Sequence, residues 1–319
     1  MKSLRRVLVY VSAVTAVWLA VCVAVGIFAA EMALHPGRNV AGAKSEALAQ
    51  AIAASRQAKL TDVSVVARDG VILRGWSIRP VQANADAVIL LHGHTDNRAG
   101  MLGYADLLLR HGYSVLLVDA RAHGMSDGNL ATYGVKEADD VRRWYDWIAR
   151  TESPGCIFGL GESMGAGQLL NSLGPNSVNR APGFCAVVAE SSFASFREAS
   201  YDRLGEKLNA GAWVGRTLLR PAVEAGFLYA RWKYGVNLEK ASPEDAVAES
   251  SVPVLLIHGL KDTNLPPRHS EMILARSRAR GSAVALWEPA GAGHTGAASA
   301  EPAEFERRVI GWFASHDRR

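Results

Sequence analysis

The sequence predicts an α/β protein built on a mostly parallel, doubly wound sheet of eight strands with a small helical insertion. Three observations lead to this prediction. After residue 60, short apolar runs alternate with amphipathic stretches of helical period. At residues 161–165, a Gly-Glu-Ser-Met-Gly box separates an apolar run from a helix-like run. Residues 7–30 contain no charged side chain, which sets them apart from the rest of the 319-residue chain.

The apolar runs after residue 60 are assigned to strands because their length and composition are typical of buried parallel strands. The expected strands are 60–67, 71–79, 87–91, 113–119, 156–161, 184–190, 252–258 and 283–288. The expected helices are 98–111, 135–150, 164–173, 267–280 and 302–315. The first strands have no helix between them, which favours an antiparallel start to an otherwise parallel sheet.

The uncharged run at residues 7–30 covers 24 positions, enough to span a bilayer as a helix. Lys2, Arg5 and Arg6 precede it, so the positive-inside rule places the N-terminus in the cytoplasm. The main domain would then lie on the non-cytoplasmic side, in a periplasm or outside the cell. A cleaved signal peptide is the alternative, but its apolar region is normally shorter, and Phe28 interrupts the small-residue spacing of a cleavage site. We favour an uncleaved single-pass anchor.

The predicted organisation has three parts: an N-terminal anchor at 1–30, a linker at 31–59 and the α/β domain at 60–319. The linker is rich in Ala, Lys, Ser and Gln and contains a helical stretch near 44–57. The net charge is +4, but five basic residues lie at the two ends of the chain. Without these five, the rest of the chain carries a net charge of −1. This balance argues against a nucleic-acid partner, which calls for a basic surface. No oligomeric state is predicted.

Ser163, at the centre of the glycine box, is the candidate nucleophile. A serine hydroxyl needs a base within hydrogen-bond reach and an acid that orients the base. Gly161 and Gly165 let a strand turn sharply into a helix and expose the serine. Gly159 and Gly161 also begin a dinucleotide-type Gly-x-Gly-x-x-Gly loop, but Met164 stands at its third glycine. A purely structural serine is the other alternative.

Asp262 and His294 are the candidate orienting acid and base. Asp262 lies on a turn after the apolar run at 252–258, and His294 lies on a glycine-rich loop after the run at 283–288. The order serine, aspartate, histidine suits nucleophilic acyl transfer on a strand–turn–helix scaffold. A turn aspartate or a lone histidine often has only a structural role. If Asp262 fails, the substitute acids are Glu288 and Asp245.

The loop after the strand at 87–91 contains two histidines, His92 and His94. The backbone N–H groups of His94 and of Met164, the residue after the nucleophile, are expected to stabilise a developing oxyanion. His92 is interpreted as a buried side chain that ties loops together. A His-x-His pair also suits a metal, but no third ligand has diagnostic spacing, so neither a metal nor another cofactor is predicted.

Six segments resemble the serine aminopeptidase and monoacylglycerol-lipase-like branch of the α/β-hydrolases. They are Leu-Leu-His-Gly-His at 90–94, Val-Asp-Ala-Arg-Ala-His-Gly-Met-Ser at 118–126, Gly-Glu-Ser-Met-Gly at 161–165, Ala-Glu-Ser-Ser-Phe at 189–193, Ile-His-Gly-Leu-Lys-Asp at 257–262 and Gly-His at 293–294. The second segment departs from the family pattern at Ala122, where glycine is usual. The resemblance implies an α/β-hydrolase fold, catalytic roles for Ser163, Asp262 and His294, and a helical lid inserted at about 194–250.

The inserted region departs from strand–helix alternation, as a lid would. Its runs at 213–219 and 225–234 are aromatic and amphipathic. Such runs are most often part of a core. The alternative is a lid that lines an apolar acyl pocket and rests on the membrane surface.

The three cysteines say little about the redox compartment. Cys22 lies within the anchor, and Cys156 and Cys185 begin strands that are neighbours in the family's sheet. These two would pair in an oxidising compartment, but buried free thiols are the interpretation that we favour.

Together these features predict a membrane-anchored serine hydrolase that cleaves carboxylic ester or thioester bonds through an acyl-enzyme on Ser163. The substrate would be a small-molecule or lipid-like acyl compound, and the N-terminal helix would contact the membrane. A serine aminopeptidase or amidase on the same residues is the alternative within serine hydrolases. Outside that class the alternatives are a non-catalytic anchored binding protein and cofactor-free haloperoxidase-like or lyase chemistry.

Overall fold

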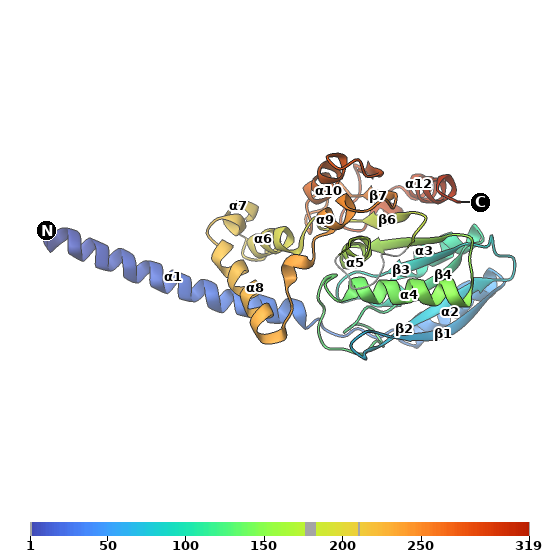
Figure 1. The fold of residues 1–319 in the computed structure, drawn as a ribbon, viewed down its shortest axis with the longest axis horizontal. Helices are drawn as coiled ribbons and strands as arrows, with labels where there is room; N and C mark the ends of the chain where they lie inside the picture. The colour runs from blue at the N-terminus through green and yellow to red at the C-terminus, as the bar shows by residue number, and fades with distance from the viewer. Residues whose placement is uncertain (1, 176–182, 210, 319) are drawn as a thin grey trace. The chain divides into compact units, whose positions relative to one another are not determined.

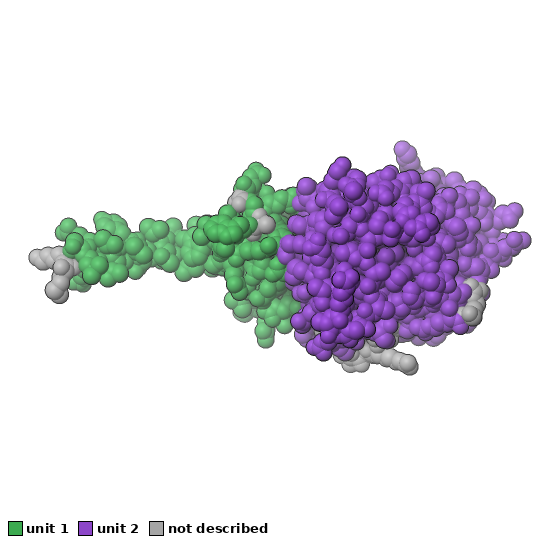
Figure 2. Space-filling model, turned by 90° about the horizontal axis from the view of Figure 1, so that it is seen from above, with its two compact units in different colours: residues 1–34, 197–239 green, residues 35–196, 240–319 purple. Residues whose placement is uncertain are grey.

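The computed structural model describes residues 2–175, 183–209 and 211–318. The chain divides into two compact units, which Figure 2 shows in different colours. Unit 1 comprises residues 1–34 and 197–239, and unit 2 comprises residues 35–196 and 240–319. Unit 2 is therefore continuous in sequence except for residues 197–239, which belong to unit 1.

Unit 2 is built on an eight-stranded sheet (Figure 1). Its strands are β1 (Ala58–Val66), β2 (Ile72–Pro80), β3 (Ala87–Leu91), β4 (Ser114–Val118), β5 (Ile157–Glu162), β6 (Val187–Glu190), β7 (Val254–Ile257) and β8 (Val284–Trp287). Their order across the sheet is β1-β2-β4-β3-β5-β6-β7-β8. β2 pairs antiparallel with both β1 and β4, and the other neighbours are parallel. The predicted sheet, including its antiparallel start, is confirmed.

Helices cover both faces of this sheet because successive residues of a strand point to opposite faces. In β3, Val88 and Leu90 join one core cluster, while Ile89 joins a second one. The first cluster is completed by α2 (Ala43–Ser55), α3 (Leu102–Arg110), which follows the short η1 (Arg98–Met101), and α12 (Pro302–Ser315). The second is completed by α4 (Glu137–Thr151), α5 (Met164–Ser172), α9 (Pro243–Ala248) and α10 (Arg268–Arg278).

The segment at 31–59 is more ordered than the solvated linker that the sequence predicts. α2 forms close to the expected helical stretch, and β1 already begins at Ala58. Ala49 and Ala53 on α2 are buried in the first core cluster. Alanines on one helical face let α2 pack into this cluster, and an alanine-rich run shows no periodicity that would reveal such a face.

Cys156 and Cys185 form a disulfide, so the expectation of free thiols at these positions is wrong. The two cysteines lie just before β5 and β6, whose pairing sets the starts of both strands side by side. The Cys185 N–H donates to the Ile157 carbonyl at 2.9 Å, which extends the strand pairing to the cysteines. Cys22 in unit 1 is a free, buried thiol.

Unit 1 consists of the N-terminal helix α1 (Lys2–Leu34) and an insert of three helices. These are α6 (Phe196–Lys207), α7 (Gly211–Arg216) and α8 (Arg220–Tyr234), followed by the short η2 (Leu238–Lys240). The segment Ser3–Leu34 is long and apolar enough to cross a membrane, with a mean hydropathy of 2.4. A signal sequence or the core helix of a soluble protein has the same length and composition, so these two properties establish only that spanning is feasible.

Candidate active site

Ser163 lies on a sharp turn between β5 and α5. Its backbone has φ 49° and ψ −116°, a region that side chains rarely adopt outside strained functional turns. Two backbone hydrogen bonds hold it there. The Ser163 N–H donates to the Glu190 carbonyl at 2.8 Å, and its own carbonyl accepts from the Gly167 N–H at 3.1 Å. The turn therefore presents the hydroxyl at the carboxyl edge of the sheet.

The two glycines of the box are required by close backbone approach. A Cβ added to Gly165 would lie 2.3 Å from the Leu91 carbonyl oxygen, and one added to Gly161 would lie 2.7 Å from the Gly165 carbonyl. Real side chains do not tolerate such distances. Any larger residue would push α5 away from β3 and β5, and Ser163 would move with it.

Asp262 and His294 are brought together by the loops that follow β7 and β8. The Lys261 N–H donates to the Ala292 carbonyl at 2.9 Å, which joins the two loops directly. A Cβ on Gly259 would lie 2.4 Å from the same carbonyl oxygen, so the close approach depends on this glycine. Both loops leave the carboxyl ends of parallel strands, the edge where open α/β sheets bind ligands.

The structure places Ser163, His294 and Asp262 in one hydrogen-bonded chain. Ser163 Oγ lies 2.8 Å from His294 Nε2, and His294 Nδ1 lies 2.7 Å from Asp262 Oδ2. Of the acids considered from the sequence, the one beside His294 is Asp262, whereas Asp245 pairs with Arg276 at 2.6 Å. A carboxylate has no proton to donate, so the proton of the neutral His294 ring lies on Nδ1, facing Asp262. Nε2 is then the acceptor that faces the serine hydroxyl.

The Asp262 carboxylate is buried and receives hydrogen bonds on both oxygens. Besides His294, His258 Nε2 lies 3.3 Å from Oδ2, and the Asn264 and Leu265 N–H groups donate to Oδ1 at 2.9 Å each. Burial alone would raise the pKa of Asp262, but the hydrogen bonds from His258 and His294 hold that pKa well below its usual range. Asp262 is therefore an anion fixed in place. His258 belongs to the family segment at 257–262, and nothing in the sequence indicated this contact with Asp262.

The loop after β3 lies against the serine. A Cβ added to Gly93 would be 3.6 Å from Ser163 Cβ. His92 is fully buried: its Nε2 accepts from the Ala120 N–H at 3.1 Å and its Nδ1 donates to the Gly93 carbonyl at 2.7 Å. Both ring nitrogens are thus engaged in tying the loops after β3 and β4 together, as the sequence predicts, and are not available to a metal.

The two expected oxyanion donors flank this loop. Met164 is the first residue of α5, where backbone N–H groups have no acceptor within the helix. His94 follows Gly93, and its ring centroid lies 5.7 Å from those of both His123 and Tyr133. Their role in stabilising an oxyanion stays a prediction.

A carboxyl pair next to Ser163 was missed by sequence reasoning. Glu162 and Glu190 are register partners at the ends of β5 and β6. The Tyr104 hydroxyl lies 3.1 Å from Glu162 Oε2 and 3.0 Å from Glu190 Oε2. A hydroxyl has one proton to donate, so both contacts are hydrogen bonds only if one carboxyl group is protonated. Burial, followed by the charge of Glu190, raises the pKa of Glu162 to about 7, and burial also raises that of Glu190.

The end of β6 also holds the loop that carries His294. Glu190 Oε1 accepts from the Ala297 N–H at 2.8 Å, and Ser191 Oγ accepts from the Thr295 N–H at 3.1 Å. The signal in the sequence was the Ala-Glu-Ser-Ser-Phe segment at 189–193, which the family resemblance marked without a function. Glu190 thus links the serine turn, through Tyr104 and Glu162, to the histidine loop.

Ala122 stands where the family usually has glycine, and the backbone explains that preference. Its φ is 62°, in the left-handed region that favours glycine. The turn around it is held by Asp119, whose carboxylate accepts from the Arg98 N–H at 2.7 Å and the Met125 N–H at 2.8 Å. The segment has a structural role in supporting the loop after β4.

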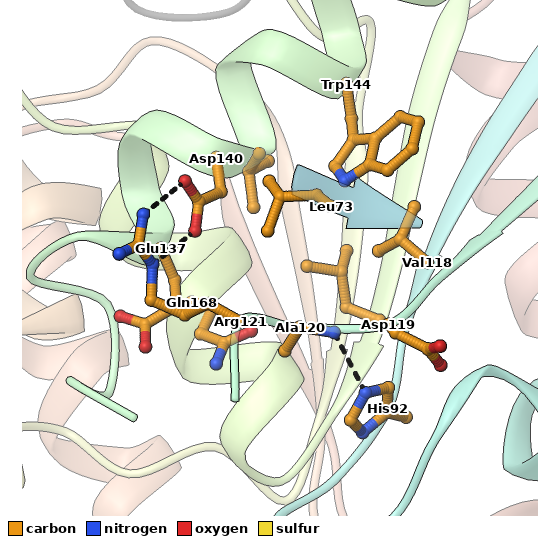
Figure 3. Close-up of a pocket in the computed structure, with 12 residues that line it drawn as sticks. Leu73, His92, Val118, Asp119, Ala120, Arg121, Glu137, Asp140, Trp144 and Gln168 are labelled. Carbon is orange, nitrogen blue, oxygen red and sulfur yellow. Dashed lines mark hydrogen bonds and ion pairs between the residues drawn. The ribbon is translucent and has the colours of Figure 1, made fainter. Parts of the chain in front are cut away.

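A small cavity lies beside His92, between β2, β4 and α4 (Figure 3). Leu73 and Trp144 form an apolar wall, and Arg121, hydrogen-bonded to Asp140 at 2.6 Å, forms a polar one. The space in which the centre of a water molecule fits measures about 10 Å³, which is enough for roughly one water. The cavity is therefore too small for a substrate.

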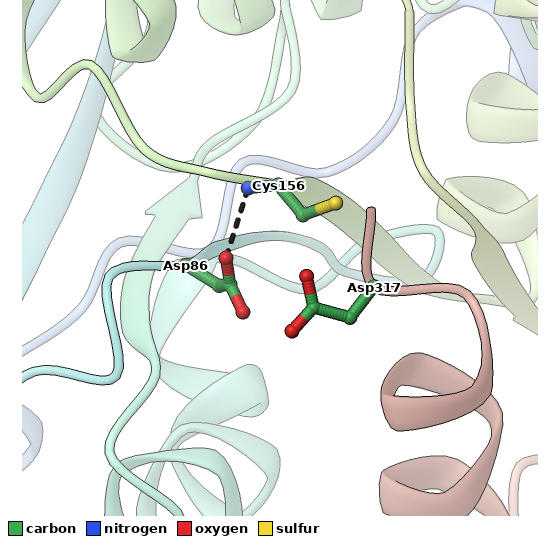
Figure 4. Close-up of side chains that lie close together, drawn as sticks. All are labelled: Asp86, Cys156 and Asp317. Atoms are coloured by element: carbon green, nitrogen blue, oxygen red, sulfur yellow. Dashed lines mark hydrogen bonds between the residues drawn. The ribbon is translucent and has the colours of Figure 1, made fainter. Parts of the chain in front are cut away.

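Within the described part of the chain, one group of potential metal ligands is close-set: Asp86, Cys156 and Asp317, with ligand atoms within 4.8 Å of one another (Figure 4). The Cys156 sulfur is bonded to Cys185, so it offers no thiolate. Asp86 Oδ1 accepts from the Cys156 N–H at 2.9 Å, which explains the carboxylate as a support for the start of β5.

Comparison with known proteins agrees with this architecture. Residues 88–308 match the alpha/beta hydrolase family. YqkD of Bacillus subtilis is 28% identical over 210 residues, which are 66% of this chain and 65% of that protein. YfhR of Escherichia coli K12 is 26% identical over 223 residues, 68% of each chain. The chain thus spans slightly less than two thirds of the first of these relatives.

Two solved structures extend the comparison to three dimensions. The Pyrococcus furiosus esterase Pf2001 has a TM-score of 0.67 and 25% identity, with 90% of this chain and 98% of that chain covered. An acylaminoacyl peptidase of Pyrococcus horikoshii has a TM-score of 0.60 and 18% identity, with 82% of this chain and 42% of that chain covered. The second shows similarity of fold alone. From the sheet, the strand–serine–helix turn and the family match over most of its length, the chain belongs to the alpha/beta hydrolase family.

Proposed function

We propose that the protein is a membrane-anchored serine hydrolase that cleaves carboxylic ester or thioester bonds through an acyl-enzyme on Ser163. The observation that carries the proposal is the chain from Ser163 Oγ to His294 Nε2, and from His294 Nδ1 to Asp262 Oδ2, at 2.8 and 2.7 Å. A nucleophile, its base and the acid that orients the base stand in the order that acyl transfer needs.

The acylation step follows from this geometry. Ser163 Oγ attacks the acyl carbon while its proton passes to His294 Nε2, and Asp262 stabilises the resulting imidazolium. The carbonyl electrons move onto oxygen, which would accept hydrogen bonds from the backbone N–H groups of Met164 and His94. Collapse of this intermediate expels the alcohol or thiol, which takes the proton from His294. Water then repeats the sequence on the acyl-enzyme and restores the serine.

An ester or thioester is the preferred substrate class because of the structural likeness to an esterase at 25% identity over nearly the whole chain. The peptidase likeness at 18% identity carries no weight for the activity, so amide cleavage enters as an outcome of the test. A non-catalytic binding protein has no need for three polar side chains in hydrogen-bonded register at a strained turn.

Placement of the hydrolase domain outside the cytoplasm is supported by two independent features. α1 is long and apolar enough to span a bilayer, and cations precede its uncharged run. The Cys156–Cys185 disulfide is a bond that persists in oxidising compartments and is rare in the cytosol. Both agree with an N-terminus in the cytoplasm and unit 2 on the far side.

Labelling of the full chain in detergent with a fluorophosphonate tests the mechanism. We expect one covalent adduct on Ser163 and none in Ser163→Ala. The control Ser55→Ala removes an exposed hydroxyl that is far from Ser163 in the sequence, and it should keep the adduct. A series of p-nitrophenyl esters of increasing chain length, beside matched anilides, then decides between esterase and amidase. Wild-type ester turnover by Ser163→Ala would refute the proposal, and turnover of anilides alone would replace the ester assignment.

A further inference from the structure

Within unit 1, α1 and α8 pack through small residues. A Cβ added to Gly26 would lie 2.0 Å from the Ala222 carbonyl oxygen, and one added to Gly226 would lie 2.8 Å from that of Gly26. Ala30 and Ala230, one turn farther along each helix, are also buried. Small residues spaced by four on both helices let backbones approach closely, the packing typical of helices in lipid. This contact ties the insert to α1.

The contacts between the two helices also give their direction. Cys22 Sγ lies 3.9 Å from the Leu218 carbonyl oxygen, Gly26 meets Ala222, and Glu31 Oε1 lies 2.9 Å from Lys233 Nζ. Residue numbers rise together along both helices, so α1 and α8 run in the same direction. The start of α8 is therefore beside the middle of α1, and its end is beside the end of α1 (Figure 1).

This contact begins near the non-cytoplasmic end of the span. Residues 3–21 are exposed on all sides of α1, and Cys22 is the first residue that unit 1 buries. Because Arg5 and Arg6 precede the uncharged run, a hydrocarbon core of roughly 30 Å, at about 1.5 Å per residue, would extend from Val7 to about residue 26. The part of α1 covered by α8 therefore begins about one helical turn before the end of the span and continues beyond it.

Large apolar side chains are exposed close to this point. Leu218, next to Cys22, is 54% exposed, and Trp213 on α7 is 70% exposed. Trp213 lies one helical turn before Thr217, whose N–H donates to the Trp213 carbonyl at 3.1 Å. Arg220, at the start of α8, is also exposed. Tryptophan with a neighbouring leucine and arginine is the combination found in the interfacial layer of membranes, where an aromatic ring or a cation contacts headgroups.

We propose that α7 and the first turn of α8 sit in the headgroup layer of the non-cytoplasmic leaflet, with Trp213 and Leu218 inserted among the lipids. The proposal rests on the anchoring assigned above. Lipid is the occupant that the structure favours because Leu218 lies beside Cys22, where the fully exposed part of α1 ends. The small-residue contact with α8 then fixes the depth of the insert.

Trp232 is an internal control for depth within the same unit. It is 82% exposed, more than Trp213, but lies fourteen residues beyond Leu218 along α8. That separation is about 21 Å along the helix axis, beyond the headgroup layer. Exposure alone would make Trp232 the more lipid-accessible of the two, whereas the proposed depth makes Trp213 so.

Site-directed fluorescence on the full chain in phosphatidylcholine–phosphatidylglycerol nanodiscs tests this order. In a Cys22→Ala background, where the two other cysteines are paired, Trp213→Cys, Leu218→Cys, Trp232→Cys and Val81→Cys each receive an environment-sensitive NBD label. Val81, an exposed residue of unit 2, reports water. We expect labels at 213 and 218 to emit at shorter wavelength and to be quenched by lipids with a nitroxide near the headgroup. Labels at 232 and 81 should be quenched far less.

The outcomes separate this proposal from the others. Retained ester turnover by each labelled chain shows that it is folded. If the chain stays with membranes after a carbonate wash but the labels at 213 and 218 behave like that at 81, the proposed seat is wrong and the anchor stands. Stronger quenching at 232 than at 213 would likewise overturn it. Loss of the chain from carbonate-washed membranes would refute both anchoring and seat, without bearing on the Ser163 chemistry.

Discussion

Units 1 and 2 differ in where they place their large apolar side chains. The core of unit 2 contains fully buried aromatic residues, such as Trp144, Phe158 and Phe313. The contact between α1 and α8 in unit 1 is made by small residues, among them Gly26 and Gly226, while Trp213 and Leu218 of the insert remain exposed. One chain therefore holds a region built by exclusion of water and a region built by close backbone packing.

The difference agrees with the anchoring proposed above, in which part of unit 1 lies in lipid. In water, association is favoured by removing large apolar surface, so aromatic residues collect inside. In lipid no such force acts between helices, and packing of small residues takes its place while large apolar groups face outward. The polar network around Ser163 belongs to the first environment, where the Asp262 and Glu190 carboxylates accept hydrogen bonds from backbone N–H groups and His294 is hydrogen-bonded to Asp262.

The largest effect is expected from Asp262→Asn in unit 2. The amide introduced at position 262 would donate to His294 Nδ1, so the histidine proton would sit on Nε2. A protonated Nε2 cannot accept the proton of Ser163, and kcat should therefore fall about 10⁴-fold. Asp245→Asn is the matched control, because its exposed pair with Arg276 contributes little. Steady-state kinetics with a p-nitrophenyl ester measure both. Near-normal kcat for Asp262→Asn would move the acid's role to another residue.

Removal of the disulfide should weaken unit 2 alone. Cys156 and Cys185 close a loop of 29 residues, so replacing both by serine should cost about 3–4 kcal/mol of unfolding free energy in the chain-entropy model. Cys22→Ser, in α1, should leave the urea midpoint of unit 2 unchanged. Equilibrium unfolding followed by circular dichroism measures the change. Three reactive thiols in the unreduced wild-type chain would contradict the pairing.

The carboxyl pair beside Ser163 predicts a pH dependence of stability. Because the pKa of Glu162 is raised to about 7, the folded state binds more protons than the unfolded state between pH about 4.5 and 7. The contribution of Glu162 to the unfolding free energy is therefore complete below pH 4.5. It is lost as the pH rises through 7, by roughly 3 kcal/mol at most. Tyr104 and Asp96 face the same carboxyl group, and the raised pKa of Glu190 acts in the same direction.

Glu162→Gln isolates this effect, since it keeps the shape and removes the titration. Unfolding free energies at pH 5, 6, 7 and 8 should fall less steeply with pH in Glu162→Gln than in the wild type. Glu249→Gln, at an exposed position, should keep the wild-type slope. Equal slopes in all three proteins would show that the pair holds no extra proton.

The smallest effect is expected in unit 1, from Gly26→Leu. A leucine would force the α1 and α8 backbones apart, at about 1–3 kcal/mol for overpacking. Ala24→Leu, on an exposed face of the same helix, adds the same side chain without the clash. Limited proteolysis within 197–239 should speed up in Gly26→Leu only. Equal rates in both variants would mean that small-residue packing does not hold this unit.

The sequence by itself determined the sheet and the places of the candidate catalytic residues. Apolar runs and glycine turns are local signals, so the strands, the turn at Ser163 and the loops of Asp262 and His294 are visible in short windows. In an α/β sheet, the carboxyl ends of parallel strands share one edge, which is why residues far apart in sequence were expected to meet.

Only the tertiary structure decided which groups far apart in sequence come into contact. The Cys156–Cys185 bond depends on two strand starts lying side by side, and the Tyr104 bridge between Glu162 and Glu190 joins a helix to two strands. The fit of α1 to α8 depends on backbone approach at Gly26. Each needs atoms placed within an ångström by the packing of whole elements, and no local pattern of residues encodes that distance.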